Sequence, residues 1–173
     1  VVPSISALTV AEATTGLAAQ FGAYIQNKSK LKVTITAAGS YSSTIKSYKT
    51  TIAGKSYTAS SFTSGVLTSS GTVTISTTVT DSRGRTATKS STVSVLAYTA
   101  PKITKFSALR TNAGVQVTMN FAIASLGDKN AKSYVLSYKP KTGDTWLQLA
   151  SGSVYTYNSS QTFSEGFSTE LSY

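Results

Sequence analysis

Apolar and polar residues alternate in short runs along most of this chain, and this period of two constrains its fold more than any other feature. The pattern is clearest over residues 30–37, and it recurs over residues 73–79 and 115–123. Successive side chains of a β-strand point to opposite faces of a sheet, so each run predicts a strand with one buried and one exposed face. No long segment has a convincing helical period. The sequence therefore predicts an all-β fold.

Two short polar segments separate runs of this kind. Asp81-Ser-Arg-Gly84 offers an aspartate whose side chain can open a turn and a glycine that can adopt the positive φ that closes it. Lys139-Pro-Lys-Thr-Gly-Asp144 has a similar composition and is expected to act in the same way. The hairpins predicted from these two turns join residues 73–80 to residues 85–97, and residues 134–138 to residues 146–149.

An internal repeat divides the chain, because three segments of its first half recur in the same order in its second half. Proline removes a donor from a strand ladder, so Pro101 marks the junction between the two copies, near residues 98–101. We therefore predict two antiparallel β-sandwich modules, residues 1–99 and residues 100–173. The matched segments are Pro3–Leu8 with Pro101–Phe106, Lys46–Tyr48 with Lys132–Tyr134, and Phe62–Val66 with Phe163–Phe167.

Each module needs a core of its own, which the apolar positions of the alternating runs should supply. The first core is expected to contain Leu31, Val33, Ile35, Tyr48, Ile52, Val73, Ile75, Val79, Val93 and Val95. The second is expected to contain Ile103, Phe106, Val115, Val117, Met119, Phe121, Tyr134, Leu136 and Tyr138.

The two copies differ in the link between their first two strands. In the first copy this link is long, Ala11–Lys28, whereas Thr111–Gly114 replaces it in the second copy. The long link is too apolar for a free tail, so we interpret it as a flap packed on the edge of the module. A partner-binding loop is the alternative, because long loops on rigid scaffolds often carry function. Its apolar residues are Leu17, Phe21, Tyr24 and Ile25.

Residues suited to catalysis are scarce. Histidine and cysteine are absent, which excludes catalytic triads built on them and zinc sites of the usual ligand type. The chain has six acidic residues, and they fall mostly in expected turns and links of different modules. No phosphate-binding or dinucleotide-binding motif is present. We therefore predict a protein that is not an enzyme, with no catalytic residues, no metal site and no cofactor.

Basic residues give the chain a net charge of +10 and are spread along it rather than clustered. A nucleic-acid-binding arm usually has clustered basic residues, so a nucleic-acid partner is not expected. A solvated strand face is one interpretation of these charges, and an anionic polymer partner such as a cell-wall glycopolymer is the other. Lys28, Lys30 and Lys32 should share one exposed strip, because alternate residues lie on one side of a strand. Together with Lys46, they are the candidate polyanion-binding residues.

Aromatic residues are frequent in both modules, and most of them are expected to fill cores or pair across strands. Trp146, Tyr155 and Tyr157 have an alternative role, because together they could form a platform on which a sugar ring stacks. The sequence places no recognisable set of sugar-binding polar residues beside them. No apolar run approaches the length needed to span a bilayer, so no membrane partner is expected.

Four segments of the chain belong together in a known order: Pro3–Val10, Asn27–Thr36, Thr78–Thr86 and Ala100–Phe106. Together they resemble a family of minor structural proteins from tailed phages and prophages of Gram-positive bacteria. The resemblance implies a virion protein of the tail or tail tip, built of immunoglobulin-like or fibronectin-like modules that act as spacers or weak carbohydrate binders. Its partners would be other tail-protein domains or chains. The second module resembles a fibronectin type III domain in its 132–139 strand and Trp146-Leu-Gln-Leu.

A repeat module of a bacterial cell-surface adhesin is the rival interpretation, because such proteins are built of the same modules. Sequence beyond Tyr173 would discriminate between them: receptor-binding or tail-assembly domains favour the phage, and an anchoring motif favours the adhesin. Fold alone does not fix function.

The second copy is also shorter than the first. Extending the third match places Tyr173 opposite Val73, and the first copy runs on from there to Tyr98 through two strands. We therefore expect module two to be incomplete. A sandwich without two strands exposes unpaired backbone and half of an apolar face. The expectation is that the parent protein continues past Tyr173, or that a neighbouring chain adds the missing strands.

Overall fold

A computed structural model describes residues 1–164 and residue 167 of the chain. The chain divides into two compact units, Val1–Tyr98 and Thr99–Tyr173. The described residues form strands β1–β13 and one short helix, α1. All strand pairs are antiparallel except that of β2 with β8. The prediction of an all-β fold is confirmed.

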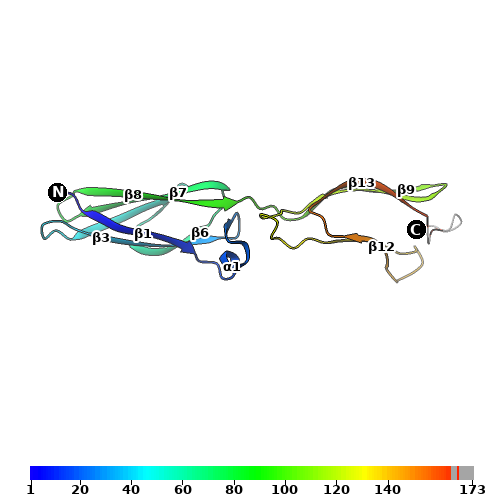
Figure 1. The fold of residues 1–173 in the computed structure, drawn as a ribbon, viewed down its shortest axis with the longest axis horizontal. Coiled ribbons are helices and arrows are strands. Elements are labelled where there is room, and N and C mark those ends of the chain that lie inside the picture. The colour runs from blue at the N-terminus through cyan, green and yellow to red at the C-terminus, as the bar shows by residue number, and fades with distance from the viewer. Residues whose placement is uncertain (165–166, 168–173) are drawn as a thin grey trace. The chain divides into compact units, whose positions relative to one another are not determined.

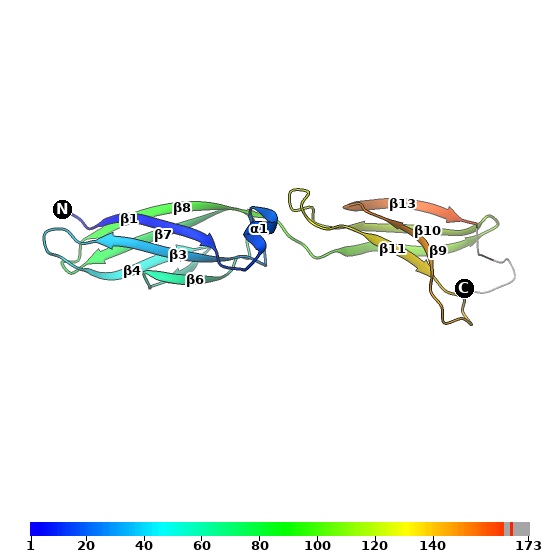
Figure 2. The same cartoon turned by 60° about the horizontal axis from the view of Figure 1, so that its bottom comes forward.

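Unit one consists of two sheets, which Figures 1 and 2 show as two layers. The smaller sheet has the order β1-β3-β6, with β1 at Ser4–Glu12, β3 at Lys30–Ala38 and β6 at Ser61–Val66. The larger sheet has the order β2-β8-β7-β4-β5, with β2 at Tyr24–Ile25, β8 at Thr86–Leu96, β7 at Gly71–Asp81, β4 at Ile45–Ile52 and β5 at Lys55–Tyr57.

The core of unit one lies between these sheets and contains the residues that alternation predicts. Nine of the ten expected residues are buried, and Tyr48 is half-buried against them. Leu67, in the connection between β6 and β7, is also part of the core. One polar contact lies inside this apolar region, where the Thr50 and Thr77 hydroxyls are 2.9 Å apart on the neighbouring strands β4 and β7. Both threonines are fully buried, so each hydroxyl satisfies the other.

The long link of unit one folds back onto the edge of its larger sheet, as expected for a packed flap. It begins inside β1, forms α1 at Leu17–Phe21, and then pairs β2 in parallel with the end of β8. Phe21 and Ile25 are buried. The Ile25 amide donates a hydrogen bond to the Ser29 Oγ at 2.8 Å, which fixes the turn that leads into β3.

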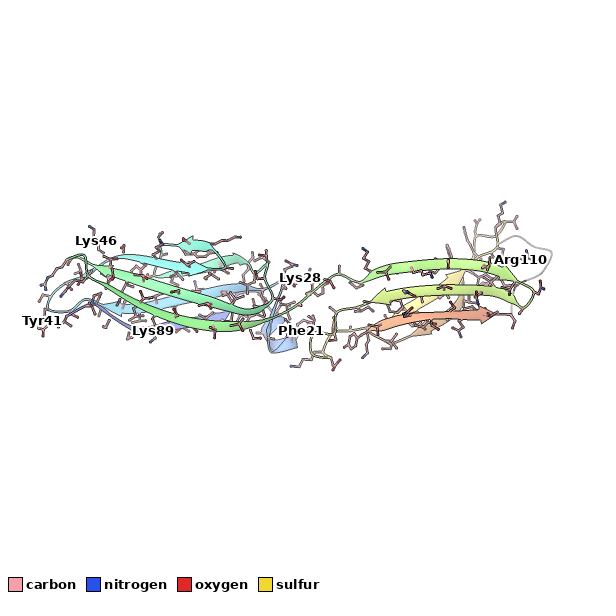
Figure 3. All side chains as sticks on the ribbon, turned by 90° about the horizontal axis from the view of Figure 1, so that it is seen from above. Phe21, Lys28, Tyr41, Lys46, Lys89 and Arg110 are labelled. Carbon is pink, nitrogen blue, oxygen red and sulfur yellow. The ribbon has the colours of Figure 1, made fainter. Side chains whose placement is uncertain are left out.

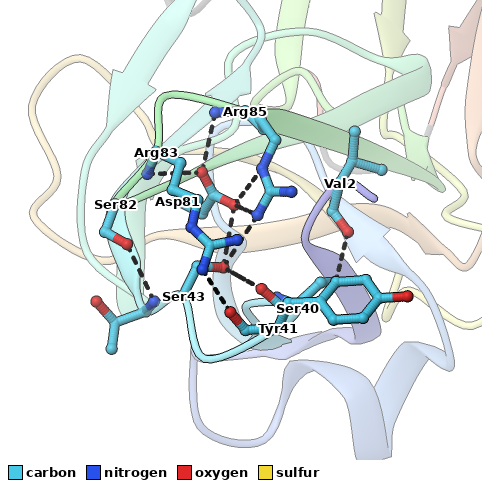
Figure 4. A network of polar contacts seen from close by, with 9 residues as sticks. Val2, Ser40, Tyr41, Ser43, Asp81, Ser82, Arg83 and Arg85 are labelled. Carbon is cyan, nitrogen blue, oxygen red and sulfur yellow. Dashed lines mark hydrogen bonds and ion pairs between the residues drawn. The ribbon is translucent and has the colours of Figure 1, made fainter.

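The predicted hairpin of unit one joins β7 to β8, and Asp81 organises its turn (Figure 4). One carboxylate oxygen accepts the backbone amides of Arg83 and Arg85 at 3.0 and 2.9 Å. The other oxygen forms an ion pair with the Arg85 guanidinium at 2.7 Å and accepts the Ser43 hydroxyl. Gly84 has the positive φ of 78° that the turn requires.

Asp81 is fully buried in this network. Burial raises the pKa of its carboxyl group, but the hydrogen bonds from Arg85, Arg83 and Ser43 outweigh that effect and lower the pKa to about 2. The carboxylate therefore remains charged in the folded protein down to strongly acidic pH.

Unit two also has two sheets, whose orders are β13-β10-β9 and β11-β12. The predicted hairpin of β11 and β12 is present, and its turn is closed by a hydrogen bond from the Gly143 amide to the Pro140 carbonyl at 3.1 Å. The strands are β9 at Lys102–Thr111, β10 at Gly114–Ala122, β11 at Tyr134–Tyr138, β12 at Leu147–Gly152 and β13 at Thr156–Phe163.

The predicted core of unit two is correct for β10 and β11 but wrong for β9. Ile103 and Phe106 were expected inside, yet they are 60% and 57% exposed. The remaining positions form the interior as expected. Val117, Met119, Phe121 and Leu136 are buried, and Val115, Tyr134 and Tyr138 are half-buried.

Candidate functional site

The first strands of the two units share one irregularity, which fixes the correspondence between the repeats. In β1 the register against β3 shifts at Ser6, and in β9 the register against β10 shifts at Thr104. Each of these residues follows its repeat proline, Pro3 or Pro101, by three positions. Their hydroxyls donate to carbonyls on the facing strand, at 3.1 Å for Ser6 and 3.3 Å for Thr104. Strands β1 and β3 therefore correspond to β9 and β10.

The third strand of each small sheet, β6 or β13, shows that one sequence match was misaligned. Phe62 pairs with Val33, whose counterpart Val117 pairs with Gln161. Phe163 instead pairs with Val115, two positions further along the sheet. The match of Phe62 with Phe163 is therefore wrong by two residues. The rest of that match includes residues 165 and 166, and the alignment of residue 173 with Val73 in the repeat extends from it. Residues 165, 166 and 173 lie outside the described residues.

The larger sheet of unit one has only a partial counterpart in unit two. Strands β4 and β5 correspond to β11 and β12, and the matched residues Tyr48 and Tyr134 are both half-buried. In unit one the other edge of β4 pairs with β7 along most of its length. Within residues 99–164 and 167, no strand pairs with that edge of β11.

Strand β9 shows the consequence for side chains. In unit one, Ile5 and Leu8 of β1 are half-buried against the core. Their repeat counterparts in β9 are Ile103 and Phe106, both of which are more than half exposed. The difference arises because β8 flanks β1, and the Lys89 ammonium of β8 donates to the Ile5 and Ser6 carbonyls at 3.4 and 3.1 Å. No described strand of unit two occupies the place of β8.

The described residues between β9 and β11 line a cavity of about 610 Å³, which we call the open face. Trp146 is 64% exposed at its rim, with the Lys139 ammonium 5.6 Å from its ring. The Phe167 ring packs on Tyr138 at 4.7 Å between centroids. Apolar side chains from both sheets therefore meet at a surface that a complete sandwich would bury. The main lining residues are Phe106, Val117, Leu136, Tyr138, Trp146 and Leu149.

The three candidate sugar-stacking residues do not share one platform. Tyr157 stacks on Phe121 at 5.7 Å and belongs to the interior aromatic cluster of unit two. Tyr155 donates its hydroxyl to the Asn130 carbonyl at 2.9 Å and lies under the Lys132 ammonium. Trp146 is the one member of the three at the open face.

The four candidate polyanion-binding lysines also separate. Lys30 and Lys32 lie on the exposed side of β3, as alternation predicts. Lys28 lies in the turn before β3, where its ammonium is 5.3 Å from the Tyr98 ring. Lys46 lies at a register shift of β4 in the other sheet. Figure 3 shows Lys28 and Lys46 at opposite ends of unit one. The predicted strip therefore contains two lysines.

The described residues contain no group of three or more histidine, cysteine, aspartate or glutamate residues placed to hold a metal ion. None of the helices in that part of the chain is long and apolar enough to cross a membrane.

Comparison with known proteins adds one finding to this geometry. The family model described as "Siphovirus protein of unknown function (DUF859)" matches residues 1–139, which include all of unit one and the first strands of unit two. Searches of curated proteins and of solved structures found no match. The match covers most of the chain and agrees with the phage resemblance drawn from its sequence. The chain therefore belongs to this siphovirus protein family.

Proposed function

We propose that this chain is a non-catalytic structural segment of the phage tail or tail tip, in which β-sandwich modules in tandem act as spacers. The observation that carries the proposal is a repeated β-architecture in a chain that belongs to a siphovirus family. The strand order of unit one supports an immunoglobulin-like or fibronectin-like module. Its sheets β1-β3-β6 and β8-β7-β4-β5 follow the two-sheet arrangement of seven-stranded sandwiches, with β2 added at one edge.

The outer surface of unit one suits a spacer. On the solvent side of the larger sheet, every cross-strand pair between β7 and β8 joins two hydroxyl side chains. Two of these pairs are directly hydrogen-bonded, Thr78 with Thr88 at 2.9 Å and Ser90 with Ser76 at 3.1 Å. Such a face is hydrated and has no large apolar patch, so neighbouring modules do not aggregate through it. The five pairs are Thr72–Ser94, Thr74–Thr92, Ser76–Ser90, Thr78–Thr88 and Thr80–Thr86.

Contact with the host envelope is the second part of the proposal. The chain carries a net charge of +10, which attracts anionic cell-wall glycopolymers at low ionic strength. The exposed strip of Lys30 and Lys32 is the part of the predicted basic site that the fold keeps together.

Labelling of intact virions tests the structural role. Antibodies raised against the chain should decorate the tails of purified particles in electron microscopy, and its peptides should co-purify with those particles. Antibody signal confined to the lysate, with particles free of the protein, would contradict the proposal. Release of soluble sugars from host cell walls incubated with the chain would contradict its non-catalytic part.

A further inference from the structure

We propose that the loop between β3 and β4, residues 39–44, binds a pendant sugar of an anionic glycopolymer through Tyr41, while Arg83 pairs with a neighbouring phosphate group of the same polymer. The inference rests on the envelope contact proposed above, and it adds the binding site and the feature of the polymer that is recognised. The loop and the turn between β7 and β8 lie together at one end of unit one (Figures 3 and 4).

The side chain of Tyr41 is the first part of the site. It is 73% exposed. Among residues 1–164 and 167, its ring stacks on no other aromatic ring and lies under no cation, and its hydroxyl forms no hydrogen bond. A tyrosine combines a large apolar ring with a polar tip, so an unpartnered one suits the apolar face and the hydroxyl groups of a sugar.

The backbone of the loop shows that the ring is displayed at a cost in stability. Tyr41 and Ser42 have positive φ values of 49° and 59°. Glycine and asparagine adopt this conformation most easily, whereas a bulky side chain in it is strained. Strained residues of this kind gather at functional sites, where the surrounding structure holds them in place. A turn alone does not require tyrosine at residue 41, so we attribute its presence to the ring.

Hydrogen bonds hold the loop in one conformation (Figure 4). The Arg83 guanidinium donates to the Tyr41 carbonyl at 2.6 Å. The Ser43 Oγ accepts the Ser40 amide at 3.0 Å and donates to the buried Asp81 carboxylate at 3.1 Å. The loop is therefore anchored to the turn that Asp81 organises. A surface fixed before binding loses little conformational entropy when a ligand docks, which favours affinity.

The charges around the loop specify an anionic ligand. Unit one has two acidic residues, Glu12 and Asp81. Glu12 lies at the end of β1 remote from the loop, where it pairs with Leu31. Asp81 is fully buried and forms an ion pair with Arg85. The exposed Arg83 has no acidic partner among the described residues, and a guanidinium fork matches the oxygens of a phosphate group.

Two forms of one polymer test the proposal. The probes are poly(ribitol phosphate) that carries N-acetylglucosamine and the same polymer without the sugar, each titrated into the chain by calorimetry. We expect the glycosylated form to bind roughly tenfold more tightly, because only this form offers a ring to Tyr41. Equal affinities would overturn the inference and leave the envelope contact standing. Binding to neither form would overturn both, while labelling of virions still decides the structural role.

Substitutions at Tyr41 show whether its ring causes the preference. Tyr41→Asn removes the ring, and asparagine adopts a positive φ with less strain than tyrosine, so the midpoint of thermal unfolding should not fall. This variant should bind both polymers equally. Tyr41→Phe keeps the ring and should keep the preference. A preference that persists in Tyr41→Asn would overturn the proposal, as would one that both variants lose.

Substitutions of basic residues separate Arg83 from general attraction. Arg83→Gln should weaken binding of both polymers and reduce its dependence on salt. Lys49→Gln removes the same charge from an exposed position in β4 and should weaken binding less. Equal weakening by these two variants would overturn the role of Arg83. Lys30→Gln with Lys32→Gln should leave the preference for the glycosylated polymer unchanged, and loss of that preference would place the sugar site on the strip.

A protein partner is the competing occupant of the loop. It predicts that affinity for either polymer does not change when Tyr41 is replaced. That outcome would overturn the proposal in favour of a protein contact at the same end of unit one.

Discussion

Unit one and unit two share five strands with the same pairing, and they differ in which described strands lie beside the third of these, β4 or β11. In unit one, β7 and β8 extend the larger sheet and bury the apolar side of β1. In unit two, the equivalent side of β9 is exposed, although Ile103 and Phe106 are as apolar as Ile5 and Leu8. The comparison shows that the burial of a strand depends on its neighbours as much as on its own pattern.

Truncation of equivalent core residues should give the largest difference between the units. Leu31 is fully buried, and its counterpart by register, Val115, is half-buried. Leu31→Ala should destabilise unit one by about 2–5 kcal/mol, because it leaves a cavity in a closed core. Val115→Ala should cost unit two about 1 kcal/mol. Hydrogen exchange resolved by segment measures both values, and equal losses would show that the two cores are equally closed.

The buried hydroxyl pair of unit one should give the next largest effect. Thr77→Val leaves the Thr50 hydroxyl without its partner and should cost about 1–3 kcal/mol. Replacing both threonines with valine should recover much of that loss, because no buried polar group is then unsatisfied. Chemical denaturation of the single and double variants measures the coupling. A double variant whose loss equals the sum of the single losses would contradict this account of the pair.

The stability of the two units should depend differently on acid pH, since Asp81 has no equivalent among the described residues of unit two. Its folded-state pKa is about 2, below the ordinary value of 3.8, so the stability that it provides is complete above pH 4. That stability is lost as the pH falls from about 4 to about 2. Asp81→Asn should flatten this dependence in unit one, whereas Asp144→Asn, in the turn of the other hairpin, should leave it unchanged. Thermal unfolding across this pH range provides the test.

Removal of the basic strip should have the smallest effect on stability. Lys30→Gln with Lys32→Gln should change the free energy of unfolding by no more than about 0.5 kcal/mol, because both side chains are exposed. If unit one binds teichoic acid, the same variant should bind more weakly and with less salt dependence. Lys46→Gln with Lys49→Gln removes the same charge from the other sheet and is the matched control. Equal weakening in both variants would indicate that net charge, not the strip, governs binding.

Local pattern predicted most of unit one, because alternation, turn chemistry and burial agree there. The core residues of β3, β7 and β8 and the turn at Asp81 follow from it directly. Helix α1 has five residues, too few for a helical period to be visible in the sequence. The parallel pairing of β2 with β8 depends on residues about 70 positions apart, which no local pattern specifies.

Unit two was less predictable for a physical reason. The apolar residues of β9 have the pattern of a buried strand, and they are exposed because no described strand covers them. The sequence match in β13 was misplaced by two residues. Residues two apart lie on the same face of a strand, so Phe163 fits the alternation pattern of Phe62 although it pairs two positions further along. Lys46 was grouped with the β3 lysines although its strand belongs to the opposite sheet.

Backbone amide exchange in the intact chain tests the central difference most directly. Strand β4 is paired on both edges, and its repeat counterpart β11 is paired on one edge among the described residues. Amides of residues 50–52 should therefore be protected throughout, whereas those of residues 134–137 should include a set that exchanges at least a hundredfold faster. Uniform and equal protection of the two strands in the chain alone would show that unit two is as closed as unit one, and would contradict this account.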